Sequence, residues 1–268
     1  MKVSFGLHRL AKPRRFLLPL LVIIAVAGGL YAWRSPRIER PVVEAMVVSP
    51  PSSEMPVFYI KTRDKKVALT FDISWGTKTL PLVLQVLRNA NQRATFFVSS
   101  PWVEMHPELA REIVAAGHEI ASHGEKHVNL STLGKAQVIE NIATAGKVIE
   151  EKLGVKTKYL RPPNGDYDDV VISAAKELGY ETVIWAVDSL DWKNPGVQFM
   201  VDRVKKLVFP GAILLFHASD SAKQTHLALP LVLEQLRKDG YQLLTLGELW
   251  TAGQPGRDDP RGKPRMPQ

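Results

Sequence analysis

The stretch KVALTFD, residues 66–72, joins a run of β-branched and apolar residues to an aspartate that follows it directly. A second run, AILLF at 212–216, ends in the same way at His217. Runs of this length and composition are typical of buried strands. Segments with helical apolar spacing separate them from other apolar runs, and strands that alternate with helices indicate parallel βαβ units.

The same alternation continues outward along the chain. Further short strands are predicted at 94–98, 119–121, 159–160, 182–186 and 242–246. Helices are predicted at 80–90, 107–116, 135–153, 170–178, 199–208 and 227–238. About seven strand–helix repeats favour a barrel-like closure over a small open sheet. We therefore expect one α/β domain, a distorted (β/α) barrel, over residues 65–250.

Composition limits the chemistry and the partners. The 268 residues contain no cysteine, which excludes disulfides, thiolate nucleophiles and cysteine-bound zinc. The formal net charge is +8, but part of it lies in the N-terminal flank, at Lys2, Arg9, Lys12, Arg14 and Arg15. The sequence has no basic stripe with interleaved aromatic residues, so we expect no nucleic-acid partner.

The two ends of the chain differ from its middle. Residues 16–33 form an uncharged apolar stretch, preceded by two arginines, that is near the lower length limit for crossing a bilayer. We expect residues 1–34 to be a cytoplasmic basic flank and a transmembrane signal anchor, which places the domain outside the cytoplasm. The small residues at 25–27 also fit a cleaved signal peptide, in which case the protein is secreted. Residues 35–64 are expected to be a linker and domain lead-in, and the Gly-, Pro- and charge-rich residues 251–268 a disordered tail.

Ionisable residues collect where the predicted strands end, which is the active face of barrel-like α/β folds. Asp72 can act as a general base toward water, or it can cap a helix. His123 and His127 have i, i+4 spacing, which on one helical turn puts both imidazoles on one face as ligands of one divalent ion. Two unrelated surface histidines are the alternative. His217 can act as a general acid, or it can be a core histidine that is hydrogen-bonded to the backbone.

Two further loops follow predicted strands. In the first, Pro163 stiffens the chain after Arg161, and the free N–H groups of the turn at Asn164 can stabilise an oxyanion or serve only a structural turn. In the second, Asp191 either pairs with Arg161 or caps its own loop, and Trp192 adds an apolar wall. A carboxylate base, metal-spaced histidines, an Arg–Asp pair and an isolated histidine at successive strand ends together suit metal-assisted amide hydrolysis.

Five ordered motifs carry a family resemblance. They are TFDISWG (70–76), SHGEKH (122–127), RPPNGDY (161–167), DSLDW (188–192) and LLFHAS (214–219). Together they resemble the motifs of the polysaccharide deacetylase (NodB-homology) family, carbohydrate esterase family 4, and the similarity is greatest to its sporulation-associated, PdaB-like branch. The resemblance implies a distorted (β/α) barrel that hydrolyses N-acetyl groups of an amino-sugar polymer, either peptidoglycan or a related cell-wall or spore glycan.

The resemblance also implies roles for individual residues. Asp72 is the expected base and His217 the expected acid that protonates the leaving amine. Arg161 is expected to orient the base, and Asp191 to steady Arg161.

A metal and an oxyanion site are implied in the same way. His123 and His127 are the expected ligands of a divalent ion such as zinc or cobalt. The backbone N–H of Asn164, which follows Pro163, is expected to help to hold the oxyanion.

The first motif departs from the family pattern. The family usually has two adjacent aspartates there, the second of which is a metal ligand, and this sequence has Ile73 in that place. The fifth motif has Ala218 where an acidic residue is common. One interpretation is an active deacetylase that holds its metal loosely. The other is a catalytically degenerate protein that binds glycan or has a structural role in the envelope or in sporulation.

Overall fold

The computed structural model describes residues 55–261 of the chain. The predicted signal anchor at 1–34, the linker before residue 55 and the last part of the predicted tail lie outside these residues. Within the described range, no helix combines the length and the apolar composition that a membrane crossing requires.

Strand β2 (Lys66–Ile73) is the centre of the sheet. It pairs in parallel with β3 (Thr95–Val98) on one side and with β8 (Ile213–His217) on the other, and its first residues also pair with β9 (Gln242–Leu244). Every residue of β2 after Lys66 is buried. A strand that is covered on both faces reads as a continuous apolar run, which explains why this stretch lacks polar alternation.

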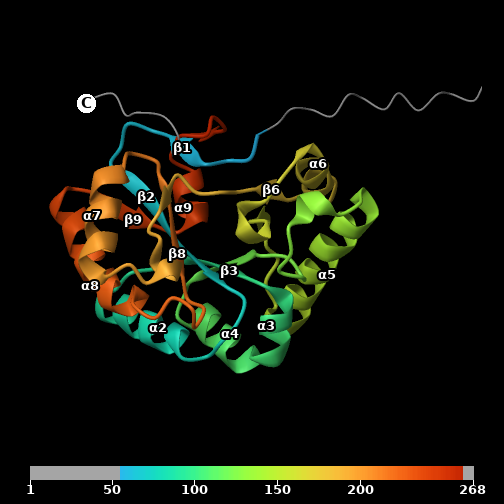
Figure 1. The fold of residues 1–268 in the computed structure, drawn as a ribbon, viewed down its shortest axis with the longest axis horizontal. Helices are drawn as coiled ribbons and strands as arrows, with labels where there is room; N and C mark the ends of the chain where they lie inside the picture. Colours follow the sequence, from blue (N-terminus) through green and yellow to red (C-terminus); the bar gives the residue numbers. More distant parts are fainter. Residues whose placement is uncertain (1–54, 262–268) are drawn as a thin grey trace, which may run out of the picture. The chain divides into compact units, whose positions relative to one another are not determined.

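The sheet is a curled half-barrel and not a closed barrel (Figure 1). Its strand order is β6-β5-β4-β3-β2-β8-β7, with β9 on β2. The strands not yet given are β4 (Glu119–Ser122), β5 (Tyr159–Leu160), β6 (Glu181–Thr182) and β7 (Val187–Asp188). Among the described strands, β6 and β7 are the two ends of this order and do not pair with each other. The α/β distorted barrel expected from the sequence is confirmed, with one side left open.

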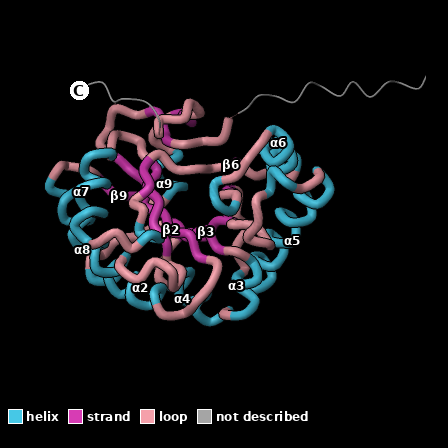
Figure 2. The backbone as a smooth tube through the Cα atoms, viewed as in Figure 1, coloured by secondary structure: helices cyan, strands magenta, loops and turns pink. Residues whose placement is uncertain are grey.

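Helices surround the strands, as the tube view shows (Figure 2). They are α2 (Thr79–Asn89), α3 (Ser100–Met105), α4 (Pro107–Ala115), α5 (Lys135–Leu153), α6 (Asp169–Glu177), α7 (Val197–Leu207), α8 (Thr225–Lys238) and α9 (Leu246–Trp250). The ends of α5 agree with the prediction, and Gly154 takes the left-handed conformation of a C-cap, with φ of 68°.

Aromatic packing holds the central strands in place. Phe71 on β2 stacks on Phe96 of β3 with ring centroids 5.1 Å apart, and its centroid lies 5.8 Å from that of Phe216 on β8. All three rings are fully buried. Because Phe71 and Phe216 directly precede Asp72 and His217, this packing fixes the position of these two polar residues.

A two-stranded ribbon lies at the open side of the half-barrel. Strands β1 (Tyr59–Lys61) and β10 (Gln254–Gly256) pair antiparallel. Val57 forms a bridge with Val183, which follows β6, and Tyr59 forms one with Ala212, which precedes β8. The ribbon therefore joins the two sides of the sheet that do not pair directly.

Three predicted elements differ from the structure. The strand predicted at 182–186 is divided into the short strands β6 and β7, because the chain between them crosses from one side of the sheet to the other. The predicted last strand ends at Leu244, and the helix α9 begins where Thr245 caps it. The expectation of a disordered tail from residue 251 does not hold up to residue 261, because β10 pairs with β1 and Asp258 accepts a 2.6 Å hydrogen bond from Tyr59.

Candidate active site

A cavity of about 400 Å³ opens at the carboxyl ends of the central strands. Asp72 reaches it from β2, His217 from β8 and His123 from the residue after β4. The other lining residues are Ser74, Trp75, His127, Asn164, Trp185, Asp188, Trp192, Leu215, Ser219 and Ser221. Six of the residues predicted for the site thus meet in one cavity, and the buried side chains of Arg161, Pro163 and Asp191 lie behind this lining.

Asp72 and Arg161 form a buried ion pair. The Arg161 Nη1 lies 2.6 Å from the Asp72 Oδ1, and the Arg161 Nη2 donates a 2.9 Å hydrogen bond to the hydroxyl of Thr70. The guanidinium also stacks on Phe97, 3.9 Å from the ring centroid. Arg161 therefore holds one carboxylate oxygen in place, and the other oxygen, Oδ2, faces the Nε2 of His123 at 3.8 Å. The contact between Arg161 and the expected base is present.

Asp191 contacts His217 and not Arg161. The Nδ1 of His217 donates to the Asp191 Oδ1 at 2.8 Å, and the backbone N–H of His217 donates to Oδ2 at 2.7 Å. The hydroxyl of Thr225 donates to the same Oδ2 at 2.6 Å. The expected pairing of Asp191 with Arg161 is therefore wrong, because the loop after β7 lies beside β8 and its carboxylate meets the nearer histidine.

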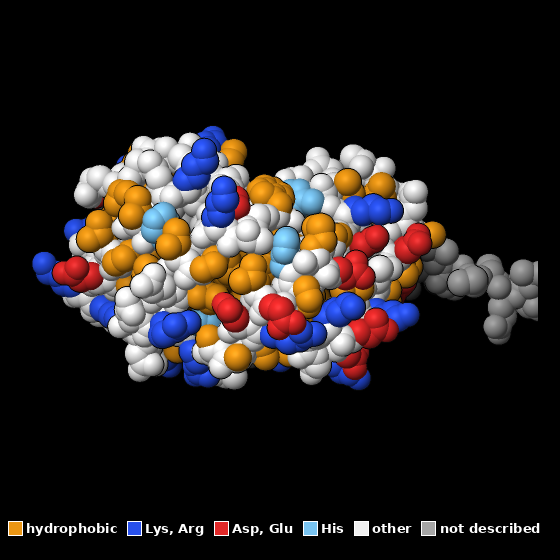
Figure 3. Space-filling view, turned by 90° about the horizontal axis from the view of Figure 1, so that it is seen from below, with side chains coloured by type: hydrophobic (Ala, Val, Ile, Leu, Met, Phe, Trp, Pro, Cys, Tyr) orange, Lys and Arg blue, Asp and Glu red, His pale blue; other side chains and the backbone are white. Residues whose placement is uncertain are grey.

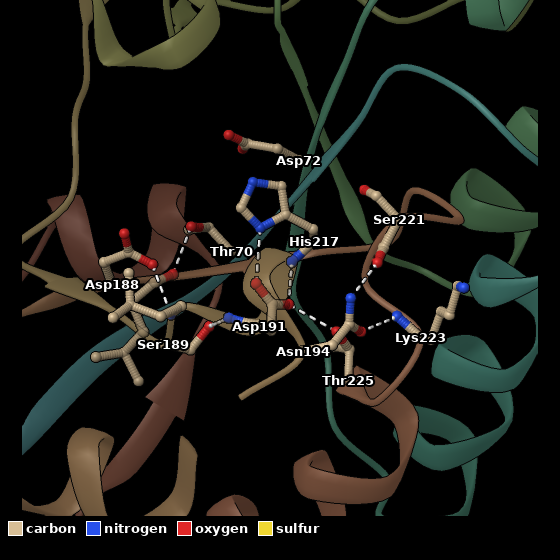
Figure 4. Close-up of polar contacts among 12 residues, drawn as sticks. Thr70, Asp72, Asp188, Ser189, Asp191, Asn194, His217, Ser221, Lys223 and Thr225 are labelled. Carbon is tan, nitrogen blue, oxygen red and sulfur yellow. Dashed lines mark hydrogen bonds and ion pairs between the residues drawn. The ribbon is translucent and has the colours of Figure 1, made fainter. Parts of the chain in front are cut away.

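The ring of His217 lies between Asp191 and Asp72 (Figure 4). Asp72 and His217 are also direct partners in the parallel register of β2 and β8. Parallel neighbours in register project their side chains from the same face of a sheet. Because Asp191 engages Nδ1, the other ring nitrogen of His217 is left to face the cavity.

The surroundings shift the pKa values of the two groups in opposite directions. Burial alone raises the pKa of Asp72. The charges of Arg161, His123 and His217 and the hydrogen bond from Arg161 lower it by more than burial raises it, so the pKa lies below its usual 3.8. Burial alone lowers the pKa of His217, but Asp191 and the other nearby carboxylates raise it above its usual 6.5. The lowered pKa of Asp72 favours the ionised carboxylate that a base needs, and the raised pKa of His217 favours the protonated imidazole that an acid needs.

The two metal-spaced histidines lie together, although not on a helix. Their segment is a loop, and the ring centroids are 5.3 Å apart at an interplanar angle of 70°. The Nδ1 of His123 donates to the carbonyl of Arg161 at 2.7 Å, which leaves its Nε2 unprotonated in the neutral ring. His127 is exposed at the rim and its ring packs edge-to-face with Trp75.

These residues fit only part of a metal centre. A catalytic zinc site takes three protein ligands and keeps one position open. The two imidazoles supply suitable nitrogens, but the side chain of Ile73 is fully buried in the apolar core and points away from the cavity. In the described part of the chain, no group of three or more His, Cys, Asp or Glu side chains is placed to hold a metal ion. The donor set therefore does not fit a three-ligand metal centre.

The turn at Asn164 carries the expected oxyanion donor. Asn164 is in the left-handed region, with φ of 59°, and its side chain donates to Asn129 at 2.8 Å. Within residues 55–261, its backbone N–H has no hydrogen-bond acceptor. Gly165, which follows, packs so closely on Trp185 that an added Cβ would lie 2.5 Å from the indole. The turn is thus pressed against the wall of the cavity.

Sequence reasoning missed several residues of the site. Thr70 lies two positions before Asp72, so the two share a face of the strand, and this alternation was a usable signal. Thr225, Trp75 and Trp185 carried no local pattern that indicates a site. Thr225 begins α8, and only the packing of that helix against the loop after β7 brings its hydroxyl to Asp191.

The sequence is similar to a known protein family and to curated relatives. Residues 59–183 match the family model described as polysaccharide deacetylase. The peptidoglycan-N-acetylglucosamine deacetylase of Bacillus cereus is 36% identical over 193 residues, which cover 71% of this chain and 90% of that protein. The uncharacterized protein YlxY of Bacillus subtilis is 33% identical over 68% of this chain, and the matching part spans 56% of its length.

A solved structure with a similar fold comes from Bacillus anthracis. It is BA3943, described as a CE4 family pseudoenzyme, with a TM-score of 0.71 and 31% identity over 75% of this chain and 71% of that chain. A mutant of the same protein, with a TM-score of 0.71 and 32% identity over 75% of this chain and 73% of that chain, is described as having restored enzymatic activity. Sequence identity, coverage and fold agree, and the chain belongs to the polysaccharide deacetylase family.

Proposed function

We propose that the chain is a hydrolase that removes N-acetyl groups from the amino sugars of a cell-wall polymer. One observation carries the proposal: Asp72 and His217 are register partners that line one cavity, and their pKa values are shifted in opposite directions, down for Asp72 and up for His217. These shifts favour an ionised base next to a protonated acid, which is what an acid–base hydrolysis needs. The names of the relatives, one of them a peptidoglycan deacetylase, support peptidoglycan as the substrate class.

The residues define a sequence of proton transfers. Asp72 removes a proton from a water molecule, and the water oxygen bonds to the carbonyl carbon of the N-acetyl group. The N–H of Asn164 donates to the oxyanion that forms. His217 gives its proton to the amide nitrogen, the carbon–nitrogen bond breaks, and acetate and a free amine leave. Proton exchange with solvent then restores Asp72 and His217.

The proton transfers above do not depend on a divalent ion, but the proposal allows one to bind. His123 and His127 are the side chains that would hold such an ion here, and its charge would help the N–H of Asn164 to stabilise the oxyanion. Because the described residues do not complete its ligand set, we propose that any ion is held loosely and exchanges with the solvent.

The place of action is part of the proposal. The uncharged apolar residues 16–33 and the arginines before them support a domain that is tethered outside the cytoplasmic membrane or secreted. A peptidoglycan substrate lies in the same compartment. The setting of sporulation is supported by the motif resemblance alone.

Acetate release tests the proposal. The full chain is incubated with N-acetylated peptidoglycan in the presence of zinc or cobalt, next to the Asp72→Asn variant. We expect acetate from the wild type and only background from the variant. No acetate from any N-acetylated wall or chitin oligomer would overturn the proposal.

A second candidate function is a non-catalytic glycan-binding protein of the envelope. The burial of Ile73 in the core and the similarity to a pseudoenzyme favour it. It predicts oligosaccharide binding without turnover, and a biological role that survives Asp72→Asn. Complementation of a deletion strain by a well-expressed Asp72→Asn variant separates the two candidates.

A further inference from the structure

Trp75 is an exposed aromatic residue at the rim of the cavity. Its exposed fraction is 45%, whereas Trp102 on α3 is fully buried. Tryptophan is costly to leave in water, and an exposed aromatic beside a cleft usually has a binding partner. On the face of the domain seen in Figure 3, hydrophobic side chains lie among histidines and dispersed charges.

The backbone around Trp75 is held firmly. The N–H of Ser74 donates to the hydroxyl of Ser219 at 3.0 Å, and the carbonyl of Trp75 accepts from the N–H of Asp220 at 3.3 Å. The carboxylate of Asp220 accepts hydrogen bonds of 2.8 to 3.2 Å from the backbone N–H groups of residues 77–79. Gly76 has φ of 84°, and an added Cβ would lie 2.2 Å from this carboxylate. The exposed indole therefore projects from an ordered loop and is ready to bind without a large loss of entropy.

A row of contacts shows where Trp75 lies relative to the base. The Oδ2 of Asp72 lies 3.8 Å from the Nε2 of His123. The ring centroids of His123 and His127 are 5.3 Å apart, and those of His127 and Trp75 are also 5.3 Å apart. Trp75 is thus the third neighbour outward from the reacting group. The exposure of the side chains rises along this row, from 2% for His123 to 45% for Trp75.

This position leaves room for a second sugar ring. An N-acetyl group at Asp72 places its own sugar over the inner part of the cavity. In a polymer the neighbouring sugar continues outward, where Trp75 offers a flat apolar face. The faces of a pyranose ring carry C–H groups, and stacking them on an indole removes apolar surface of both partners from water.

We propose that Trp75 is a stacking platform for the sugar next to the acetylated one, so that the site binds an oligomer more tightly than a single amino sugar. The inference rests on the proposed glycan substrate and adds which part of it is recognised. The indole contributes binding and no chemistry. Its loss therefore weakens the binding of oligomers and leaves the binding of a monosaccharide unchanged.

Calorimetric titration of the full chain tests the inference. The ligands are N-acetylglucosamine and its β-1,4-linked tetramer, and the variants are Trp75→Ala and Trp75→Phe. We expect Trp75→Ala to raise the Kd of the tetramer about tenfold and to leave the Kd of the monosaccharide unchanged, as the loss of one stacked ring predicts. Trp75→Phe, which keeps a smaller aromatic face, should recover most of the affinity. Phe199→Ala is the matched control, because Phe199 has an exposed fraction of 46% and lies outside the cavity lining.

Each other outcome counts against the inference. Equal affinity of the wild type and Trp75→Ala for the tetramer overturns it. Equal weakening for both ligands also overturns it, because it assigns Trp75 to the support of His127. If the wild type binds neither ligand, the proposed glycan substrate fails as well, which separates that failure from a failure of Trp75 alone.

Discussion

Arg161 connects the stability of the domain to the chemistry of its base. Its guanidinium is fully buried, and its contacts are the carboxylate of Asp72, the hydroxyl of Thr70 and the ring of Phe97. A buried cation is tolerated only when it is paired, so Asp72 stabilises the fold as well as being the expected base. Loss of activity in an Asp72 variant must therefore be separated from loss of the fold.

A double-mutant cycle makes that separation. We expect Asp72→Ala to lower the free energy of unfolding by about 3–5 kcal/mol, because it leaves the buried guanidinium unpaired. Arg161→Met added to Asp72→Ala should recover much of this loss, since it removes the unpaired charge and keeps an apolar side chain of similar length. Urea unfolding of the wild type, both single variants and the double variant measures the coupling. Additive losses would contradict a direct ion pair.

The pKa of His217 gives a pH prediction. Catalysis needs the protonated form, so activity is expected to persist above pH 6.5 and to fall as the pH rises through the raised pKa. Asp191→Asn removes the largest of the contributions that raise this pKa, so the alkaline fall should move to lower pH. NMR titration of the His217 ring checks the shift even if turnover is slow. An unchanged pKa in Asp191→Asn would contradict the assigned contact.

At this scale, the sequence predicted the members of the site better than their pairings. Asp72, His123, His127, Asn164, Trp192 and His217 all line the cavity. The predicted partner of Asp191, Arg161, was wrong, because spacing along the chain does not show which of two strand-end residues lies nearer to a loop. Trp75 was quoted only within a motif, since exposure beside a cleft is a property of the folded surface.

At the scale of elements, the loops after β2 and β8 work as one unit. Asp220, which follows β8, accepts hydrogen bonds from three backbone N–H groups at the start of α2. Burial alone raises the pKa of Asp220, but these hydrogen bonds outweigh it and hold the pKa below the usual 3.8. The carboxylate thus caps a helix that is distant in sequence and fixes the loop that carries Trp75.

Removal of this cap should be measurable. We expect Asp220→Ala to lower the free energy of unfolding by about 1 kcal/mol, as the loss of other helix N-caps does. Asp220→Asn keeps one acceptor oxygen and should lose less. Asp202→Ala on the outer part of α7 is a control for removal of a surface carboxylate. Equal stability of Asp220→Ala and the control would contradict the capping role.

Elements with a strong periodic pattern were predicted well, and those that depend on tertiary pairing were not. The predicted and observed ends of α5 coincide, because a capped amphipathic helix of this length carries its own signal. The strand expected at 182–186 is two short strands, because apolar composition does not show that the chain changes its partner halfway. The strand β10 was missed because Gly and Pro favour a turn or a tail when the pairing partner is far away in sequence.

At the scale of the whole domain, the ribbon of β1 and β10 completes an incomplete barrel. The ribbon joins the segment after β6 to the segment before β8. Arg257 adds contacts to the carbonyl of Met55 at 2.8 Å and to Glu181 at 3.0 Å. Arg261 lies over Trp185, 5.4 Å from the ring centroid, so the C-terminal segment also supports a wall of the cavity. The domain thus extends beyond the expected 65–250 at both ends.

Truncation tests this role of the ribbon. A chain that ends at Ala252 loses β10 and the contacts of both arginines, and we expect its Tm to fall by at least about 5 °C. A chain that ends at Arg261 keeps every contact described above and is the matched control. Differential scanning calorimetry gives both values. Equal Tm values for the two truncated chains would contradict a structural role for the ribbon.

The central claim is that Asp72 and His217 hydrolyse N-acetyl groups of a cell-wall glycan. Mass spectrometry of the recovered glycan tests it most directly, after incubation of N-acetylated peptidoglycan with the wild type, Asp72→Asn or His217→Gln in the presence of zinc. The account predicts loss of acetyl groups with the wild type and an intact glycan with both variants. Intact glycan with the wild type, combined with binding of that glycan, would contradict the account and establish the non-catalytic binding protein in its place.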